Sequence, residues 1–258
     1  MRGFGMKEKN TERKSDVISG RNPVSEALRG NRPIDKILVA KGEKSGAVVG
    51  ILAKARDKQI PVKEVDRAKL DYISLGAPHQ GIVAFAAVKD YCTVGEIFEY
   101  AQSKNEAPFI IILDELEDPH NLGAVIRTAE CAGVHGVIVP KRRSAGLSYT
   151  VGKASAGAVE YMRVARVTNI ASLIDDIKSR GVWVYGADMN GTDYRKCDFS
   201  GACAIVVGNE GKGLSRLVRE KCDVIVSLPM KGNINSLNAS VAAGILMYRA
   251  MDGRTERK

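Results

Sequence analysis

The chain has 258 residues, of which 45% are hydrophobic, and it carries a net charge of +9. This length allows one large domain or a small domain joined to a medium one, and the composition is that of a protein with a buried core. No apolar run approaches the roughly 20 residues of a membrane-spanning helix, and the polar start lacks the apolar stretch of a secretory signal. We therefore expect residues 1–16 to be a disordered basic leader.

Positive charge is concentrated in the first third of the chain. Residues 1–90 hold 18 Lys and Arg against 11 Asp and Glu, an excess of 7, whereas residues 91–258 hold 21 against 19, an excess of 2. This asymmetry favours a nucleic-acid-recruiting module fused to a second part. A soluble protein with a basic tail explains the charge alone equally well, because Lys7, Lys9, Arg13 and Lys14 of the leader raise the count.

The five cysteines and three histidines are scattered, and no two cysteines form a CxxC pair. This spacing argues against a zinc site and against a disulfide framework. It favours a reducing compartment, so we expect a cytoplasmic protein without a metal.

Residues 17–90 predict a compact α/β unit. Strands are expected at 34–40 and 81–88, a helix at 47–59 and a further strand at 61–65. The charged helical stretch that follows, 91–107, is expected to be a linker.

From residue 108 onward the pattern predicts a parallel sheet covered on both faces. Runs that are apolar on both faces and alternate with helical segments are typical of such sheets. The expected strands are 109–113, 136–139, 182–187, 204–207 and 224–228. The last helix, 236–251, places four apolar residues at near-helical spacing: Leu237, Val241, Ile245 and Tyr248.

Ligands of open parallel sheets bind at the carboxyl ends of the strands, and three of these ends carry unusual loops. The first loop follows strand 109–113 and reads D-E-L-E-D-P-H-N-L-G-A-V-I-R. Asn121 can cap the helix that follows. Arg127 lies on that helix among apolar neighbours, where it either extends into solvent or binds an anion such as phosphate.

The second loop follows strand 204–207 and reads G-N-E-G-K-G. Three glycines within six residues let the backbone approach a ligand closely, although many such loops are only tight turns. The loop matches neither the Gly-Lys-Ser/Thr phosphate loop nor the GxGxxG dinucleotide fingerprint. Glu210 would repel a phosphate, so it suits a cationic or donor-rich ligand, or an arginine partner.

The third loop follows strand 224–228 and reads P-M-K-G-N-I-N-S-L-N-A-S. Asn235 or Ser236 can cap the last helix. The amide and hydroxyl side chains in this loop exceed what one cap requires: Asn233, Asn235, Ser236, Asn238 and Ser240.

In this order and at these strand ends, the three loops resemble the motifs of the SpoU (TrmH-like) RNA 2′-O-methyltransferases. The matching pieces are N-L-G-A-V-I-R, V-G-N-E-G-K-G-L and S-L-P-M-x-G-x-x-x-S-L-N-A-S-V-A. Upstream, residues 19–28 and 79–84 resemble the substrate-binding domain of this family, so the resemblance covers 17–252. Within the family, the chain resembles most the bacterial subgroup that methylates a guanosine in the peptidyl-transferase loop of 23S ribosomal RNA.

The resemblance implies an architecture that periodicity alone would not predict. It implies a catalytic α/β domain over 108–254 that is tied into a trefoil knot and works as a homodimer. It also implies an RNA substrate-binding domain over 17–90, similar to L30e-like RNA binders. True knots are so rare that the knot is expected from the resemblance alone.

The resemblance also assigns residues to roles. Six residues of the second and third loops are expected to contact S-adenosylmethionine, mainly through the backbone: Gly208, Asn209, Gly213, Leu228, Pro229 and Leu237. The expected catalytic residues are Asn121, Arg127, Glu210, Ser236 and Asn238, with no metal. RNA contacts are expected at Arg21, Asn22, His79 and Gln80. For these N-terminal residues, stabilisation of the first helix is an alternative role.

Methyl transfer from a sulfonium needs no metal, because the cofactor carries its own leaving group. The ribose 2′-hydroxyl must approach the methyl in line and lose its proton, and holding that geometry accounts for much of the acceleration. An arginine normally stays protonated. We therefore expect Arg127 to orient the adjacent phosphate and stabilise the forming alkoxide; the alternative is that the arginine itself is the base.

Two other classes of protein fit the sequence less well. An RNA-binding ribosome-assembly factor without activity would not need Arg127, Glu210, Ser236 and Asn238 together. A nucleotide-dependent oxidoreductase is disfavoured because no GxGxxG follows the first strand of the sheet. Ribosomal RNA is favoured over transfer RNA as the substrate, since the transfer-RNA enzymes that the chain resembles typically lack the N-terminal domain.

Overall fold

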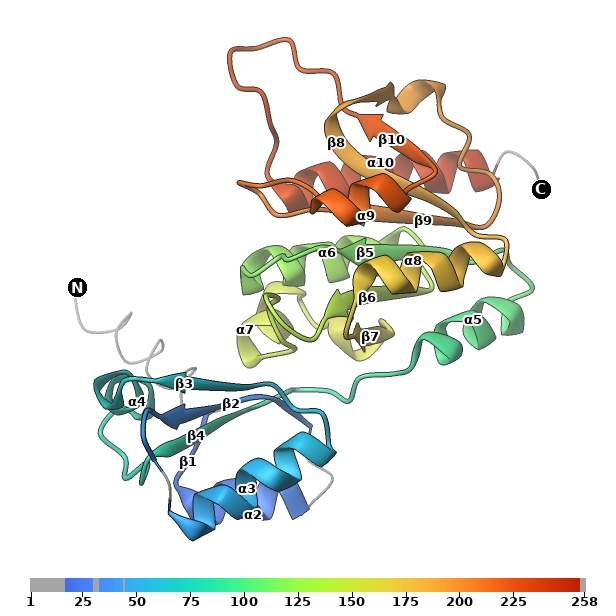
Figure 1. Cartoon of the computed structure of the whole chain (residues 1–258). Helices are drawn as coiled ribbons and strands as arrows, with labels where there is room; N and C mark the ends of the chain where they lie inside the picture. Colours follow the sequence, from blue (N-terminus) through green and yellow to red (C-terminus); the bar gives the residue numbers. More distant parts are fainter. Residues whose placement is uncertain (1–16, 30–32, 44, 256–258) are drawn as a thin grey trace. The chain divides into compact units, whose positions relative to one another are not determined.

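The computed structural model describes residues 17–29, 33–43 and 45–255, and the predicted leader lies outside them. The chain divides into two compact units (Figure 1). Among the described residues, the first unit comprises those within 17–90 together with 146–152, and the second comprises 91–145 together with 153–255.

The first unit is a four-stranded mixed sheet with helices on both faces. Its strand order is β1 (Val17–Ser19), β4 (Ile82–Ala86), β2 (Ile34–Ala40) and β3 (Val62–Val65). Strand β4 runs antiparallel to β1 and β2, and β3 runs parallel to β2. The predicted strands 34–40, 61–65 and 81–88 are confirmed to within two residues at each end, whereas the short β1 was not predicted.

Two clusters of apolar side chains hold the helices of the first unit to its sheet. Helices α2 (Arg21–Arg29) and α3 (Gly46–Asp57) bury Val24 and Val48 against one face. Helix α4 (Arg67–Ser74) buries Leu70 against the other. The alternation of inward and outward residues along β2 and β4 supplies both faces.

The predicted linker contains a helix that packs into the second unit. Helix α5 (Val94–Ser103) begins with a capping box, in which Thr93 and Glu96 satisfy each other's backbone N–H groups. Ile97 is fully buried in the core of this unit, and the Cys92 N–H donates to the Val164 carbonyl at 2.9 Å. The packed part of the second unit therefore already begins within 91–107.

The second unit is built on a six-stranded sheet in which every neighbouring pair of strands is parallel, as predicted. Its strand order is β10 (Val224–Ser227), β8 (Trp183–Asp193), β9 (Cys203–Val207), β5 (Phe109–Leu113), β6 (Gly136–Pro140) and β7 (Val164–Val167). All five predicted strands are present, and β7 was missed. The trefoil knot and the likeness to L30e-like binders stay predictions.

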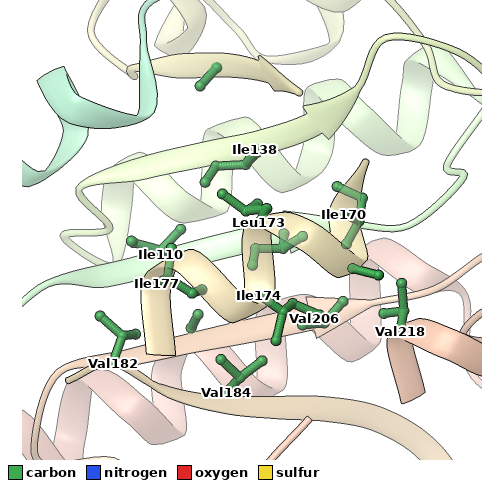
Figure 2. Close-up of a cluster of buried hydrophobic side chains, with 14 of the residues drawn as sticks. Ile110, Ile138, Ile170, Leu173, Ile174, Ile177, Val182, Val184, Val206 and Val218 are labelled. Atoms are coloured by element: carbon green, nitrogen blue, oxygen red, sulfur yellow. The ribbon is translucent and has the colours of Figure 1, made fainter. Parts of the chain in front are cut away.

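Helices cover both faces of this sheet. Helices α8 (Ile170–Ser179) and α9 (Arg216–Lys221) lie on one face, and α6 (Pro119–Cys131) and α10 (Ala239–Thr255) on the other (Figure 1). Figure 2 shows the isoleucines of α8 packed on strand residues such as Ile110 and Val206. The remaining helical segments are α7 (Tyr149–Ala154), η1 (Ala158–Glu160) and η2 (Tyr194–Lys196). Among the described residues, no helix has the length and apolar character needed to cross a membrane.

Helix α10 begins three residues later than predicted and is apolar on two faces. Its buried face carries Ala243, Leu246, Met247 and Ala250. The apolar residues noted in the sequence lie on the other face, where Val241 is 50%, Ile245 37% and Tyr248 45% exposed. A helix that is apolar all round normally has a partner on each side.

Candidate active site

The loops after β5 and β9 meet because these strands are parallel neighbours in the sheet. The Asp114 N–H extends the pairing by donating to the Val207 carbonyl at 2.8 Å. The buried Asp114 carboxylate accepts from the Ser215 N–H at 2.8 Å. One carboxylate therefore fastens the end of the second loop to the start of the first.

Asn209 shapes the glycine-rich loop from within. Its backbone pairs with that of Gly213 in both directions, at 3.0 and 2.8 Å. Its side-chain oxygen accepts from the N–H groups of Gly211 and Lys212, and its amide donates to the Glu115 carbonyl at 3.0 Å. Asn209 is thus committed to the loop through its side chain and its main chain, and its predicted contact with the cofactor stays a prediction.

Glycine at position 208 is required by the fold of the loop itself. A Cβ at Gly208 would lie 2.3 Å from the carbonyl carbon and oxygen of Gly213 and 2.5 Å from the Leu214 nitrogen. Gly213 adopts a φ of +67°, which favours glycine. The sequence suggested that these glycines let a ligand approach the backbone closely. In the structure they let the two sides of their own loop approach each other.

A hydrogen-bonded network of three side chains joins all three predicted loops. The Glu210 Oε1 atom accepts from Asn121 Nδ2 at 2.5 Å and from Asn238 Nδ2 at 2.8 Å. Asn238 Nδ2 also donates to Asn121 Oδ1 at 2.9 Å, and Asn121 Nδ2 donates to Asp118 Oδ2 at 3.1 Å. Both amide NH₂ groups therefore have two acceptors each. Three of the five residues predicted to be catalytic are brought together here.

The helix caps differ from those predicted. Asp118 caps α6 by accepting from the His120 N–H at 3.0 Å, and Asn121 lies inside the first turn. Asn238 caps α10, because its Oδ1 atom accepts from the N–H groups of Ser240 and Val241. The caps proposed from sequence, Asn121 and either Asn235 or Ser236, were therefore wrong.

The structure does not bring Arg127 and Ser236 into this network. Both side chains are exposed, and neither makes a hydrogen bond or ion pair with the described part of the chain. The guanidinium of Arg127 thus keeps all its donors for a ligand.

The loop between β10 and α10 is open to solvent. Residues 229–238 are exposed, and within the described chain 229–237 form no hydrogen bond. The loop carries exposed apolar side chains, with Ile234 74%, Leu237 38% and Met230 37% exposed, and it extends from the sheet edge in Figure 1. Free backbone donors and acceptors beside apolar side chains fit a ligand that is recognised mainly through the main chain, as predicted for Leu228, Pro229 and Leu237.

In the first unit, the residues predicted to contact RNA divide into two groups. The Arg21 guanidinium donates to the Gln80 carbonyl at 3.0 Å and pairs with Glu43 at 3.4 Å, while the Gln80 side chain accepts from the Arg21 N–H. A hydrogen bond from the Ser45 N–H, aided by Arg21, lowers the pKa of Glu43. Together with the exposed Asn22, this cluster leaves polar groups at the surface.

His79 is instead enclosed. It is 5% exposed, its Nδ1 atom accepts from the Gly81 N–H at 3.0 Å, and its Nε2 atom lies 2.8 Å from an Asp71 carboxylate oxygen. With both ring nitrogens engaged, His79 supports the turn before β4, and this geometry favours a structural role over RNA contact.

Comparison with known proteins decides the family. Residues 108–248 match the model of the SpoU rRNA Methylase family, and residues 17–92 match the model described as RNA 2'-O ribose methyltransferase substrate binding. The chain belongs to the SpoU rRNA methylase family. The predicted resemblance is thereby confirmed, and the protein is an RNA methyltransferase of the SpoU/TrmH type.

Individual relatives agree with this assignment. The chain is 47% identical over 234 residues to YacO of Bacillus subtilis, named as a TrmH family tRNA/rRNA methyltransferase, with 90% of this chain and 94% of the relative covered. Among solved structures it is similar to the SpoU methyltransferase AviRb of Streptomyces viridochromogenes in complex with AdoMet, at a TM-score of 0.58 and 26% identity. The comparison covers 93% of this chain and 90% of AviRb. It is also similar to an AdoMet-bound rRNA methyltransferase of Sinorhizobium meliloti, at a TM-score of 0.57 and 26% identity. That comparison covers 92% of this chain and 87% of the other.

Two glycines of the same loop offer a matched test of its geometry. Gly208→Ala must displace the backbone at Gly213, so we expect a loss of about 1–3 kcal/mol in the free energy of unfolding. Gly211→Ala would place its Cβ 3.7 Å from the nearest atom, an ordinary contact, and should change stability by less than about 0.5 kcal/mol. Urea unfolding followed by circular dichroism measures both; equal effects would contradict the observed loop geometry.

Asn238 and Asn235 form a second matched pair. Asn238→Ala removes the α10 cap and two hydrogen bonds of the network, and we expect a loss of about 1–2 kcal/mol because the site is partly exposed. Asn235→Ala removes no hydrogen bond within the described chain and should be neutral. Thermal unfolding of the two variants distinguishes these effects, and a neutral Asn238→Ala would show that the network does not hold the loops.

Proposed function

We propose that this SpoU-family protein transfers a methyl group from S-adenosylmethionine to a ribose 2′-hydroxyl, with a guanosine in the peptidyl-transferase loop of 23S ribosomal RNA as its substrate. The observation that supports this proposal most directly is the network of Asn121, Glu210 and Asn238, which gathers the three motif loops at the carboxyl ends of the sheet. The ribosomal RNA substrate implies a cytoplasmic location, which is part of the proposal.

The third loop fits the cofactor by its chemistry. Its free main-chain groups suit the amino, carboxyl and adenine edges of S-adenosylmethionine, and its apolar side chains suit the adenine face. Leu228, Pro229 and Leu237 would hold it, together with the main chain of 208–213. When bound, S-adenosylmethionine supplies an electrophilic methyl group on a sulfonium that is its own leaving group. Two similar solved structures contain AdoMet, which supports this assignment.

Glu210 acts as a positioning residue. One of its carboxylate oxygens already accepts two hydrogen bonds from Asn121 and Asn238. A carboxylate in this position orients both amides, because a flipped amide would place its oxygen against the negative charge. We propose that Glu210 thereby fixes the two amide side chains beside which cofactor and ribose align.

Arg127 acts on the RNA. Its free guanidinium can hold the phosphate next to the reacting ribose in a bidentate manner and stabilise the charge that develops on the 2′-oxygen. The proton of the 2′-hydroxyl then passes to that phosphate or to water. Ser236, exposed within the third loop, would accept a hydrogen bond from the ribose or donate one to it.

The first unit supplies RNA recognition. The surface cluster of Arg21, Asn22 and Gln80 lies in the region that matches the substrate-binding family model. We propose that residues 17–90 bind the RNA and residues 108–254 carry out the transfer. The relative in Bacillus subtilis is named for both tRNA and rRNA, so transfer RNA is the second candidate substrate.

Methyl transfer to purified RNA tests the reaction. We expect labelled S-adenosylmethionine to modify one ribose in ribosomal RNA from cells that lack this protein, and Arg127→Ala to lower kcat by about 10²-fold or more. Arg180→Ala, which removes an exposed arginine paired with Asp176, should leave the rate unchanged. A base role for the arginine predicts instead that Arg127→Lys restores activity with a shifted pH profile.

The outcomes separate the alternatives. Label in transfer RNA alone would replace the ribosomal substrate. Cofactor binding without transfer to purified RNA would direct the test to ribosome-assembly intermediates, and failure there too would leave a non-catalytic assembly factor. Absence of cofactor binding would refute the proposed reaction.

We also propose that the protein is a homodimer joined through α10. The exposed apolar residues Val241, Ile245 and Tyr248 form one stripe along this helix, opposite its buried face. A second copy presenting the same stripe would cover it by twofold symmetry.

A charge placed in the stripe should separate the subunits. We expect light scattering during size-exclusion chromatography to give twice the chain mass for the wild type and a single-chain mass for Ile245→Glu. Leu217→Glu, at a more exposed apolar position on α9, should remain dimeric. A monomeric wild type would contradict the proposal.

A further inference from the structure

A pocket lies at the opposite ends of the strands from the candidate active site. It has a volume of about 510 Å³ and is lined in part by Trp183, Cys203 and Val224, the first residues of β8, β9 and β10. Gly208 and the polar network follow the carboxyl ends of the sheet. The pocket is therefore separate from the site of methyl transfer.

An open indole forms one wall of this pocket. Trp183 is 57% exposed, although its neighbours Val182 and Val184 are buried on the other face of the sheet. Strand β10 begins opposite Tyr185, two residues further along β8, so no β10 residue flanks Trp183. A large planar aromatic surface left open inside a concave site is suited to stacking with a flat ligand.

The loop 196–202 forms another part of the lining and is held at both ends. Tyr185 packs against Phe199 with ring centroids 4.5 Å apart, and its hydroxyl donates to the Asp198 carbonyl. At the other end of this loop, the Arg254 guanidinium donates to the Gly201 carbonyl at 2.7 Å. Because the loop is fixed at both ends, a ligand would not have to order it on binding.

Polar side chains complete the lining beside the indole. They are the hydroxyls of Thr192 and Ser200, the ammonium of Lys196 and the carboxylate of Asp198, which accepts from the Ser200 N–H at 2.9 Å. Hydroxyls can donate to and accept from the edge of a base, and the ammonium is a point charge for a phosphate. Aromatic side chains beside cationic groups bind single nucleotides by stacking and charge, with little dependence on sequence.

We propose that this pocket binds a nucleotide, with its base stacked on Trp183 and its phosphate on Lys196. The ligand has two possible sources, a free nucleotide or an unpaired nucleotide within RNA. This function goes beyond methyl transfer, because the pocket holds a nucleotide that does not react.

Trp183 is the only tryptophan of the chain, so its fluorescence reports on this pocket alone. The full-length protein is titrated with guanosine 5′-monophosphate and, separately, with a short single-stranded RNA, each with and without saturating S-adenosylmethionine. We expect saturable quenching that the cofactor does not abolish. Quenching by the mononucleotide identifies a free nucleotide as sufficient, whereas quenching by RNA alone identifies a nucleotide within a strand.

Two variants test the assigned contacts. Lys196→Ala should weaken the binding of the quenching ligand about tenfold. Lys104 lies outside the pocket with its ammonium over the Tyr100 ring, so Lys104→Ala should leave the affinity unchanged. Trp183→Ala, at an exposed position compatible with folding, should weaken binding of the same labelled ligand in equilibrium dialysis by a similar factor.

Three results would overturn the proposal: no quenching by either ligand, quenching lost when S-adenosylmethionine is added, or unchanged affinity in both variants. None of these readouts requires turnover. An absence of methyl transfer would therefore not contradict the nucleotide proposal. An absence of Trp183 quenching would not contradict the proposed reaction.

Discussion

The arrangement of the candidate active site depends on one carboxylate oxygen of Glu210, which accepts hydrogen bonds from amides 89 and 28 residues away in the chain. Each of the three loops that it joins follows a different strand, and the third forms no hydrogen bond with the described residues before Asn238. Asn121 uses both ends of its amide, because Nδ2 donates to the carboxylate while Oδ1 accepts from Asn238. An aspartate at position 121 or 238 would lose the donor and add a repelling charge, which explains why both positions carry asparagine.

The sheet makes this network possible by placing the loops accurately. Strand β5 is buried along its entire length, with α8 over one face and α6 and α10 over the other. Close packing on both sides fixes the strand ends, since interiors of this density tolerate little displacement. The functional groups can then lie on loops, where exposure is needed for RNA and cofactor. Rigidity comes from the strands and the network, and access comes from the open loop 229–237.

Most of the fold could be predicted from the sequence, but only part of the site. Runs such as 109–113 are apolar on both faces, and this signal is local and unambiguous. Strand β7 was missed because Arg166 interrupts a four-residue run that is only half buried. The α6 cap was misassigned although Asp118 precedes a proline at the first helical position, which is a recognisable start signal.

The Glu210 network joins residues up to 117 positions apart, and the enclosure of His79 depends on Asp71 and Gly81 in three dimensions, so no local pattern contains either. Strand β10 begins at Val224 as predicted, but the open face of Trp183 depends on the register of β10 against β8, which no local pattern contains.

Helix α10 connects these features within the second unit. At its amino end Asn238 belongs to the network, and at its carboxyl end Arg254 donates to the Gly201 and Ala107 carbonyls. The 17 residues of the helix span about 25 Å, so it links the two ends of the sheet as one rigid element. Its buried face packs on α6 and β9, and its open face carries the apolar stripe. A subunit that binds the stripe would therefore hold the helix that carries both Asn238 and Arg254. Dimerisation would in this way stabilise the methyl-transfer site and the wall of the Trp183 pocket together, although neither site needs a residue from the partner for the contacts described.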